Sequence, residues 1–195
     1  IAQGHELFTA NQAQLVALPA DIRMFVLENE VKHFGNADLF DQLLKAYTQT
    51  TDSSYKADIL AALTSTTDPT QIAKLVDKFE DADTIKPQDL RSWFRGVLNN
   101  HAGEQAALDW LRNEWQWLEK TVGGDMEFTT YITVIAGVFR TPERLTEFKA
   151  FFEPKLQTPG LTREITMDTS VIASRVSLIH AEQQAVQAAV AEAVK

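Results

Sequence analysis

Apolar residues recur along this chain with the spacing of an α-helix. Positions i, i+3, i+4 and i+7 are apolar in three separate segments, which begin at Phe40, Ile72 and Phe128. Residues with that spacing share one face of a helix. A wider stripe of the same kind runs from Leu90 to Leu98. Since no segment alternates apolar and polar side chains as a half-buried strand does, the pattern predicts an all-α fold.

Prolines, glycines and capping residues mark where these helices begin and end. Asp68-Pro69 and Thr141-Pro142 each place a capping side chain before a proline in the first helical turn. Glycines are expected to follow helix ends, as at Gly35. Together these signals predict helices over residues 4–17, 20–34, 37–48, 53–65, 69–80, 87–100, 103–122, 127–139, 142–153 and 162–195.

Short loops between the predicted helices favour antiparallel hairpins. Hairpins that begin near residues 37, 69, 103 and 142 recur at a pitch close to that of helical repeat proteins, although the sequence itself does not repeat. We therefore expect a single domain over 1–195, a two-layer α-α superhelix of about ten antiparallel helices that resembles HEAT or armadillo solenoids. The long last helix, with an apolar stripe from Ile172 to Val190, is expected to cap it; contact with a partner helix or another domain is the alternative.

Composition excludes several kinds of protein. The chain has no cysteine, which excludes disulfides and thiolate chemistry and fits the reducing cytoplasm, the location we expect. A net charge of −9 argues against binding to nucleic acid or to an anionic membrane surface. This acidity favours solubility; attraction of cationic groups such as peptide amino termini is the alternative. The chain starts at Ile1 without an initiator methionine or signal peptide, so we expect a fragment of a longer protein.

The sequence predicts neither a catalytic nor a metal-binding residue. Its four histidines are never three or four residues apart, so no helix face offers two imidazoles to a metal ion. His5-Glu6 begins like the zinc motif His-Glu-x-x-His, but Thr9 stands where the second histidine belongs. Nucleophile-elbow and phosphate-loop motifs are absent as well.

Three arginines are the candidate substrate contacts. Arg91 and Arg95 lie one helical turn apart, and Arg140 precedes the Thr141-Pro142 helix start. A guanidinium can bind a carboxylate through two parallel hydrogen bonds, so these residues are expected to form a cationic patch that faces a peptide. Ordinary surface ion pairs are the alternative.

Several tryptophans and glycines are expected to serve packing. Four tryptophans lie between Trp93 and Trp117, and we expect core positions for all except Trp117, which lies off the apolar stripe. Gly96 and Gly137 interrupt predicted helices, and close approach of two helices is the simplest reason.

Two stretches resemble the C-terminal helical domain of the aminopeptidase N family. The first runs from Ile85 through Pro87-Gln88-Asp89 to Trp93-Phe94 and continues in residues 107–115; the second is Val138 to Leu145 with Phe148 and Phe151-Phe152. Leu108 departs from this pattern, since the family usually has an aromatic residue there.

The resemblance implies a zinc aminopeptidase that releases N-terminal amino acids from peptides. Its gluzincin zinc site would belong to an upstream catalytic domain, with no cofactor in this fragment. The fragment would be non-catalytic and would help to enclose the active-site chamber, gate access to it and contact peptides. Its partners would be that catalytic domain and peptide substrates. A free-standing HEAT-like scaffold for protein–protein binding is the alternative function.

Overall fold

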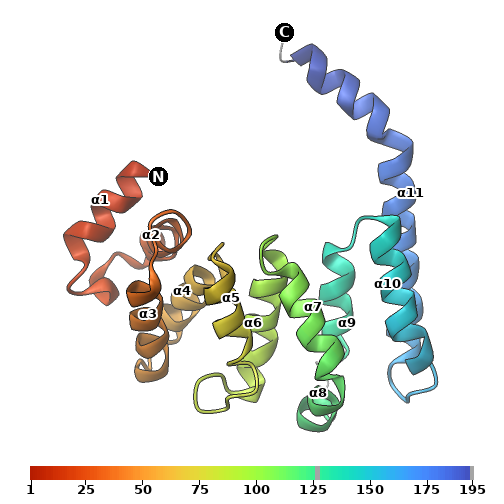
Figure 1. The fold of residues 1–195 in the computed structure, drawn as a ribbon, viewed down its shortest axis with the longest axis horizontal. Helices are drawn as coiled ribbons and strands as arrows, with labels where there is room; N and C mark the ends of the chain where they lie inside the picture. The colour runs from red at the N-terminus through yellow and green to blue at the C-terminus, as the bar shows by residue number, and fades with distance from the viewer. Residues whose placement is uncertain (126–127, 194–195) are drawn as a thin grey trace. The chain divides into compact units, whose positions relative to one another are not determined.

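The computed structural model describes residues 1–125 and 128–193 of the chain. Within these residues it contains eleven α-helices, two short 3-10 helices and no strand, which confirms the all-α prediction. The chain divides into two compact units, Ile1–Val122 and Gly123–Lys195, whose helices are labelled in Figure 1. The single superhelical domain over 1–195 stays a prediction.

The first unit places three helices side by side in the order α2, α4, α6. Helix α1 packs on α2, α3 packs on α4, and α7 packs on both α5 and α6 (Figure 1). The elements are α1 (Ala2–Asn11), η1 (Leu15–Ala17), α2 (Ala20–His33), α3 (Ala37–Gln49), α4 (Ser53–Thr64), α5 (Pro69–Val76), α6 (Pro87–Asn99), α7 (Glu104–Asn113) and α8 (Trp115–Val122).

The second unit is built around the long helix α11, which contacts both α9 and α10. Its elements are α9 (Thr130–Val138), α10 (Pro142–Phe152), η2 (Glu153–Lys155) and α11 (Thr162–Ala193). Gly160 has a φ of 88° in the turn before α11, a backbone conformation that glycine adopts without strain. The core of this unit includes Phe139, Phe148 and Phe152, all nearly inaccessible to solvent.

Side-chain caps begin several helices where the sequence predicts them. The Asp68 carboxylate accepts hydrogen bonds from the Thr70 and Gln71 amides, and the Thr141 hydroxyl accepts one from the Arg144 amide. Each satisfies amide groups that have no partner inside the helix. The proline that follows each cap suits the first turn, where its missing N–H has no consequence.

Three predicted helices are shorter or divided. Residues 4–17 form α1, which ends at Asn11, and η1, because the backbone at Gln14 is not helical (φ −146°, ψ 67°); Pro19 then disfavours helical backbone at Leu18, whose ψ is 139°. Residues 103–122 divide into α7 and α8 at Glu114, where each helix buries its own tryptophan, Trp110 or Trp115. Residues 69–80 end as a helix at Val76. Turns follow, held by the Asp81 carboxylate, which accepts hydrogen bonds from Lys78, Asp83 and Thr84.

The tryptophans occupy the positions that the apolar stripes predict. Trp93, Trp110 and Trp115 are buried, whereas Trp117 is partly accessible. The Trp93 indole donates a hydrogen bond to the Tyr47 hydroxyl at 3.1 Å, and their rings meet edge to face. Buried indoles need such a partner for their N–H group, so these rings serve the core and not a stacking platform.

The two interior helical glycines have different surroundings. A Cβ added to Gly96 would lie 2.7 Å from the Thr64 side chain, so α6 approaches α4 closely at this point, as predicted. A Cβ added to Gly137 would meet no described atom within 4 Å. The expectation of a close approach at Gly137 is therefore wrong, because α9 has open space beside this residue.

Candidate functional site

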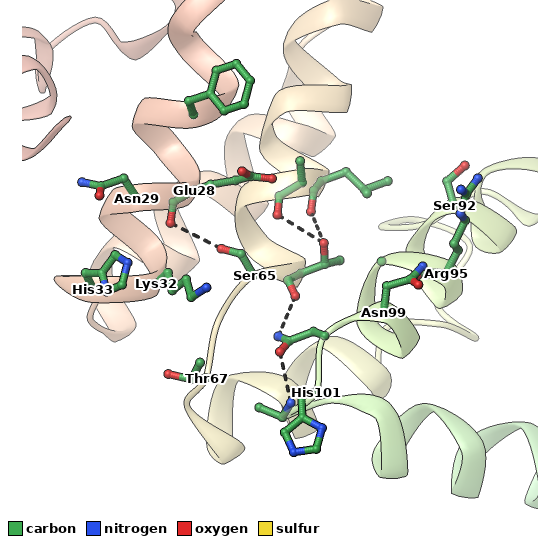
Figure 2. Close-up of a pocket in the computed structure, with 17 residues that line it drawn as sticks. Glu28, Asn29, Lys32, His33, Ser65, Thr67, Ser92, Arg95, Asn99 and His101 are labelled. Carbon is green, nitrogen blue, oxygen red and sulfur yellow. Dashed lines mark hydrogen bonds between the residues drawn. The ribbon is translucent and has the colours of Figure 1, made fainter. Parts of the chain in front are cut away.

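A groove of about 960 Å³ lies over α4 in the first unit, between side chains from α2 and α6. Figure 2 shows its polar side chains, with those of α2 and α6 on opposite sides of α4. A smaller hollow of about 290 Å³ shares Leu60 and Ser92 with the groove, so the two form a continuous surface.

The floor of the groove is lined by Leu60 of α4 and by small side chains on α4 and at its carboxyl end. Ala61, Thr64 and Ser65 line it, with Gly96 at the close approach of α6. Because none of these side chains is long, the space above α4 stays open.

Hydrogen bonds hold the backbone at the end of this floor. The Asn100 amide donates to the carbonyl oxygens of Thr64 and Thr66 at 2.8 and 2.6 Å, and its oxygen accepts from the Ala102 amide. The Ser65 hydroxyl donates to the Glu28 carbonyl on α2 at 3.4 Å (Figure 2). The end of α4 is thus tied to both neighbouring helices, which makes this a preformed surface.

The walls carry cations in an otherwise acidic chain. Lys32 on α2 and Arg95 on α6 line the groove against one acidic residue, Glu28, whereas the chain has 27 acidic and 18 basic residues. His33 and His101 stand at the same end as Lys32 (Figure 2). Neither Lys32 nor Arg95 forms a hydrogen bond or ion pair with another described side chain, unlike Lys74 with Asp41. The groove therefore carries two cations that form no side-chain hydrogen bond or ion pair among the described residues, although Lys32 lies near Glu28.

The α2 side of the groove also carries an apolar side chain, Phe25, and a partly buried carboxyl group, Glu28. The Phe25 side chain lines the groove although 61% of the residue surface is exposed. Burial raises the pKa of the Glu28 carboxyl, an effect that the nearby Lys32 ammonium partly opposes.

The three predicted arginines have different environments. Arg95 is exposed and lines the groove, but Arg91 is half-buried on α6 and does not line it. Arg140 is exposed between α9 and α10 and belongs to the second unit. One unit therefore holds Arg91 and Arg95, and a patch that joins all three arginines stays a prediction.

Sequence reasoning missed the residues of the α2 wall. Phe25 and Lys32 are seven residues apart and so share a helix face, a signal that the sequence contains. Nothing local indicates that this face lies opposite Arg95, because that depends on the order of α2, α4 and α6 in the fold.

The described residues contain no cluster of three histidine, aspartate or glutamate side chains that could hold a metal ion. The His5 imidazole contacts the Glu30 carboxylate at 2.8 Å and stacks on Phe34, so it serves the packing of α1 on α2. Among the helices that the structure describes, none has the length and apolar character needed to cross a membrane.

Comparison with known proteins places the chain in a family. Residues 1–174 match the family model described as the ERAP1-like C-terminal domain. Aminopeptidase N of Lactobacillus helveticus is 59% identical over 194 residues, which cover 100% of this chain and 23% of that protein. Aminopeptidase N of Lactobacillus delbrueckii subsp. lactis is 52% identical, with 99% and 23% covered. Glutamyl aminopeptidase of Bos taurus is 26% identical over 166 residues, with 84% and 17% covered.

The chain thus spans about a quarter of the length of these bacterial relatives. The whole-chain identities agree with the resemblance seen in the sequence around Pro87 and Pro142. The chain belongs to the ERAP1-like C-terminal domain family and is the C-terminal domain of an aminopeptidase N family protein.

Proposed function

We propose that this chain is the non-catalytic C-terminal domain of a zinc aminopeptidase, in which it helps to enclose the active-site chamber, gates access and contacts peptide substrates. Family membership and the names of the relatives support the aminopeptidase. The groove over α4 supports the contact with peptides, because Lys32 and Arg95 line it and neither forms a hydrogen bond or ion pair with another described side chain. This groove is the observation that carries the proposal.

The zinc ion and the residues that bind it would belong to the catalytic domain of the same polypeptide. Bound there, zinc would supply a Lewis acid that polarises the peptide carbonyl and activates water. The chain described here would act on the substrate before that step, by orienting a peptide and excluding larger molecules. We propose the cytoplasm as its location, since the sequence has no cysteine. We further propose that residues 1–195 act as one superhelical domain.

Peptide length provides a direct test in the longer enzyme. A peptide that reaches the groove would lose contacts in the double variant Lys32→Gln/Arg95→Gln, whereas a single-residue anilide would not reach it. We expect kcat/KM for peptides of about ten residues to fall on the order of tenfold, with anilide turnover unchanged. Lys45→Gln, which removes an exposed cation on α3, is the matched control.

Equal loss for both substrates, or no loss for either, would contradict a role in peptide contact. Arg140→Gln and Arg91→Gln in the same assay test the predicted three-arginine patch. If that patch exists, each will reproduce the difference between long and short substrates. The alternative function, a free-standing scaffold for protein–protein binding, would require that the full polypeptide contain no peptidase domain upstream of these residues.

A further inference from the structure

We propose that the exposed second half of α11, residues 177–193, docks against an apolar helix in the part of the polypeptide that precedes these 195 residues in the longer enzyme. The inference concerns contact between parts of one polypeptide and does not depend on peptide binding in the groove over α4. Three properties of α11 carry it: the continuity of its apolar face, the spacing of that face, and its charge.

One face of α11 packs within its own unit and then continues without a partner. α11 contacts α9 and α10, and its residues Ile165 and Ile172 are buried. The same face continues at intervals of three and four residues through Val176, Ile179, Gln183, Val186, Val190 and Ala193. Every residue from Ser177 to Ala193 is exposed, and Figure 1 shows this half of α11 extending beyond α9 and α10. The packing face is therefore longer than the helices that cover it.

The spacing of this face is typical of a helix that pairs with another helix. From Ile172 to Ala193 its members alternate intervals of four and three residues, an average of 3.5, as in helices that wrap around each other. Gln183 is the one polar member. The exposed part, from Ile179 to Ala193, is about 21 Å long and corresponds to about four helical turns. A helix of that length is the partner that fits it.

The composition of the segment also indicates a covered surface. Residues 177–193 contain no lysine or arginine, and their only acidic residues are Glu182 and Glu192. Val186 and Val190 nevertheless have 58% and 57% of their surface exposed. A helix with so much accessible aliphatic surface and so little charge is stabilised when another apolar surface covers it.

Charge and size argue against a second copy of this chain as the partner. Two copies of the segment would bring Glu182 and Glu192 of both together without a basic side chain, and each chain has a net charge of −9. The exposed stripe has five members, whereas a stable interface between separate proteins uses about 20 residues on each side. Self-association through this stripe would therefore be weak.

A partner in the same polypeptide requires a smaller interface. Covalent connection raises the effective concentration of the two surfaces to about millimolar, so a short stripe is sufficient. The chain makes up 23% of Aminopeptidase N of Lactobacillus helveticus, so most of such a polypeptide is available to provide the partner. The family model ends at residue 174, before the segment begins. The partner surface would be apolar, with lysine or arginine beside it to pair with Glu182 and Glu192.

Hydrogen exchange of the longer enzyme, followed by mass spectrometry, tests this docking. Val186→Lys/Val190→Lys places two charges on the stripe without weakening the helix, because lysine favours helix more than valine does. We expect the backbone amides of residues 177–193 to exchange about tenfold faster in this variant than in the unchanged enzyme, since a helix end that loses its cover opens more often.

Ala181→Lys/Ala188→Lys is the matched control. Both alanines lie on the face of α11 opposite the stripe, so two lysines there should leave the exchange rate unchanged. All four substituted residues are exposed in the 195-residue chain, so both variants keep its fold.

Equal exchange rates in the unchanged enzyme and in Val186→Lys/Val190→Lys would overturn the proposal. So would an equal acceleration in the two double variants. Slow exchange that is lost on dilution, while the molar mass from light scattering falls from two copies to one, would overturn it in favour of a second copy. Because the measurement does not involve peptide turnover, its failure is distinct from that of the proposed function.

Discussion

At the scale of single residues, Arg23 connects three segments of the first unit. Its Nε donates to the Asp58 carboxylate on α4 at 2.6 Å, and its Nη1 donates to the Val16 carbonyl at 3.0 Å. The guanidinium also lies over the Tyr55 ring. Both charged side chains are almost fully buried, so each depends on the other to offset the loss of hydration.

Removing one partner of this pair should be strongly destabilising. Arg23→Met leaves the Asp58 charge buried without its cation, and we expect the free energy of unfolding in urea to fall by about 3 kcal/mol. The double variant Arg23→Met/Asp58→Leu should recover a large part of that loss. Lys74→Gln, which breaks the exposed pair with Asp41, should cost less than about 1 kcal/mol. A similar cost for Arg23→Met and Lys74→Gln would show that burial of the pair is unimportant.

Substitution by alanine should have opposite effects on stability at the two helical glycines, Gly96 and Gly137. Gly96→Ala would place a methyl group against the buried Thr64 side chain, and we expect a loss of about 1–3 kcal/mol. Gly137→Ala meets open space and should be neutral or stabilising by up to about 1 kcal/mol, because alanine favours the helix. Thermal unfolding of both variants measures the difference. Adding Thr64→Ala should rescue Gly96→Ala; without rescue, the contact with Thr64 is not the cause.

At the scale of helices, the sequence could predict those helix boundaries that are set by residues close together in the chain. Asp68 and Thr141 form caps with amides only two or three residues away, so their role is visible in a short segment. The break at Glu114 has no such signal, since no proline or glycine lies near it, and it follows instead from how two tryptophans are buried. Propensity cannot reveal a boundary that tertiary packing imposes.

The residues of the candidate site also differ in whether the sequence alone could predict their positions. Arg95 could be placed on the exposed side of its helix, because Leu90, Phe94 and Val97 form the apolar side. Its position opposite Lys32 could not be predicted, since those residues come together only when α2, α4 and α6 are placed in order. Sequence therefore identified one residue of the groove and missed the wall that faces it.

Asp168 makes the stability of the second unit depend on pH. It lies buried on α11, and its Oδ2 has no hydrogen-bond partner among the described residues. Burial raises the pKa of this carboxyl and Glu164 raises it further, while the nearby Thr133 hydroxyl, which donates a hydrogen bond to Glu164 at 2.7 Å, lowers it. The folded state thus holds the proton more strongly than the unfolded state. This contribution is fully present below the unfolded pKa and is lost as the pH rises through the folded pKa.

Replacing Asp168 by asparagine should remove this dependence. We expect the melting temperature of Asp168→Asn, relative to the unchanged chain, to increase from pH 3.5, below the ordinary carboxyl pKa, to pH 7.5, because the variant has no Asp168 proton to lose as the pH rises. Glu164→Gln, at a residue that is not fully buried on the same helix, should change this difference much less. A relative melting temperature that is the same at both pH values would contradict a raised pKa at Asp168.

The second half of α11 contributes little to the core of its unit. Ile165, Asp168 and Ile172 are buried, whereas every residue from Ser177 to Ala193 is exposed. The expected cap therefore extends to about Ile172, and Val186 and Val190 of the same stripe remain accessible.

Ending the chain after His180 should consequently leave its stability almost unchanged. We expect a change in the free energy of unfolding within about 0.5 kcal/mol, accompanied by a smaller helical dichroism signal. Ile172→Ala is the contrasting variant and should cost about 2–4 kcal/mol, since it leaves a cavity at a fully buried position. A loss on truncation as large as that of Ile172→Ala would mean that the exposed half stabilises the fold.

At the scale of the whole molecule, the proposed single domain makes a prediction that the tryptophans can test. All four tryptophans lie in the first unit, so their fluorescence reports on that unit alone. Phe148 lies in the core of the second unit, against Phe139 and Phe152. In helical arrays, stability is shared between neighbouring repeats, and damage to one repeat is transmitted to the next.

Phe148→Ala should remove about 3–5 kcal/mol from the core of the second unit. If residues 1–195 unfold as one cooperative domain, the tryptophan fluorescence midpoint in urea will fall together with the midpoint from far-ultraviolet dichroism. Arg23→Met, a change in the first unit, should shift both signals in the same way. Two independent domains would give a different result: Phe148→Ala would leave the tryptophan midpoint unchanged and would add an early transition to the dichroism curve alone. Coincidence of the two midpoints in both variants is therefore the outcome that a single superhelical domain requires.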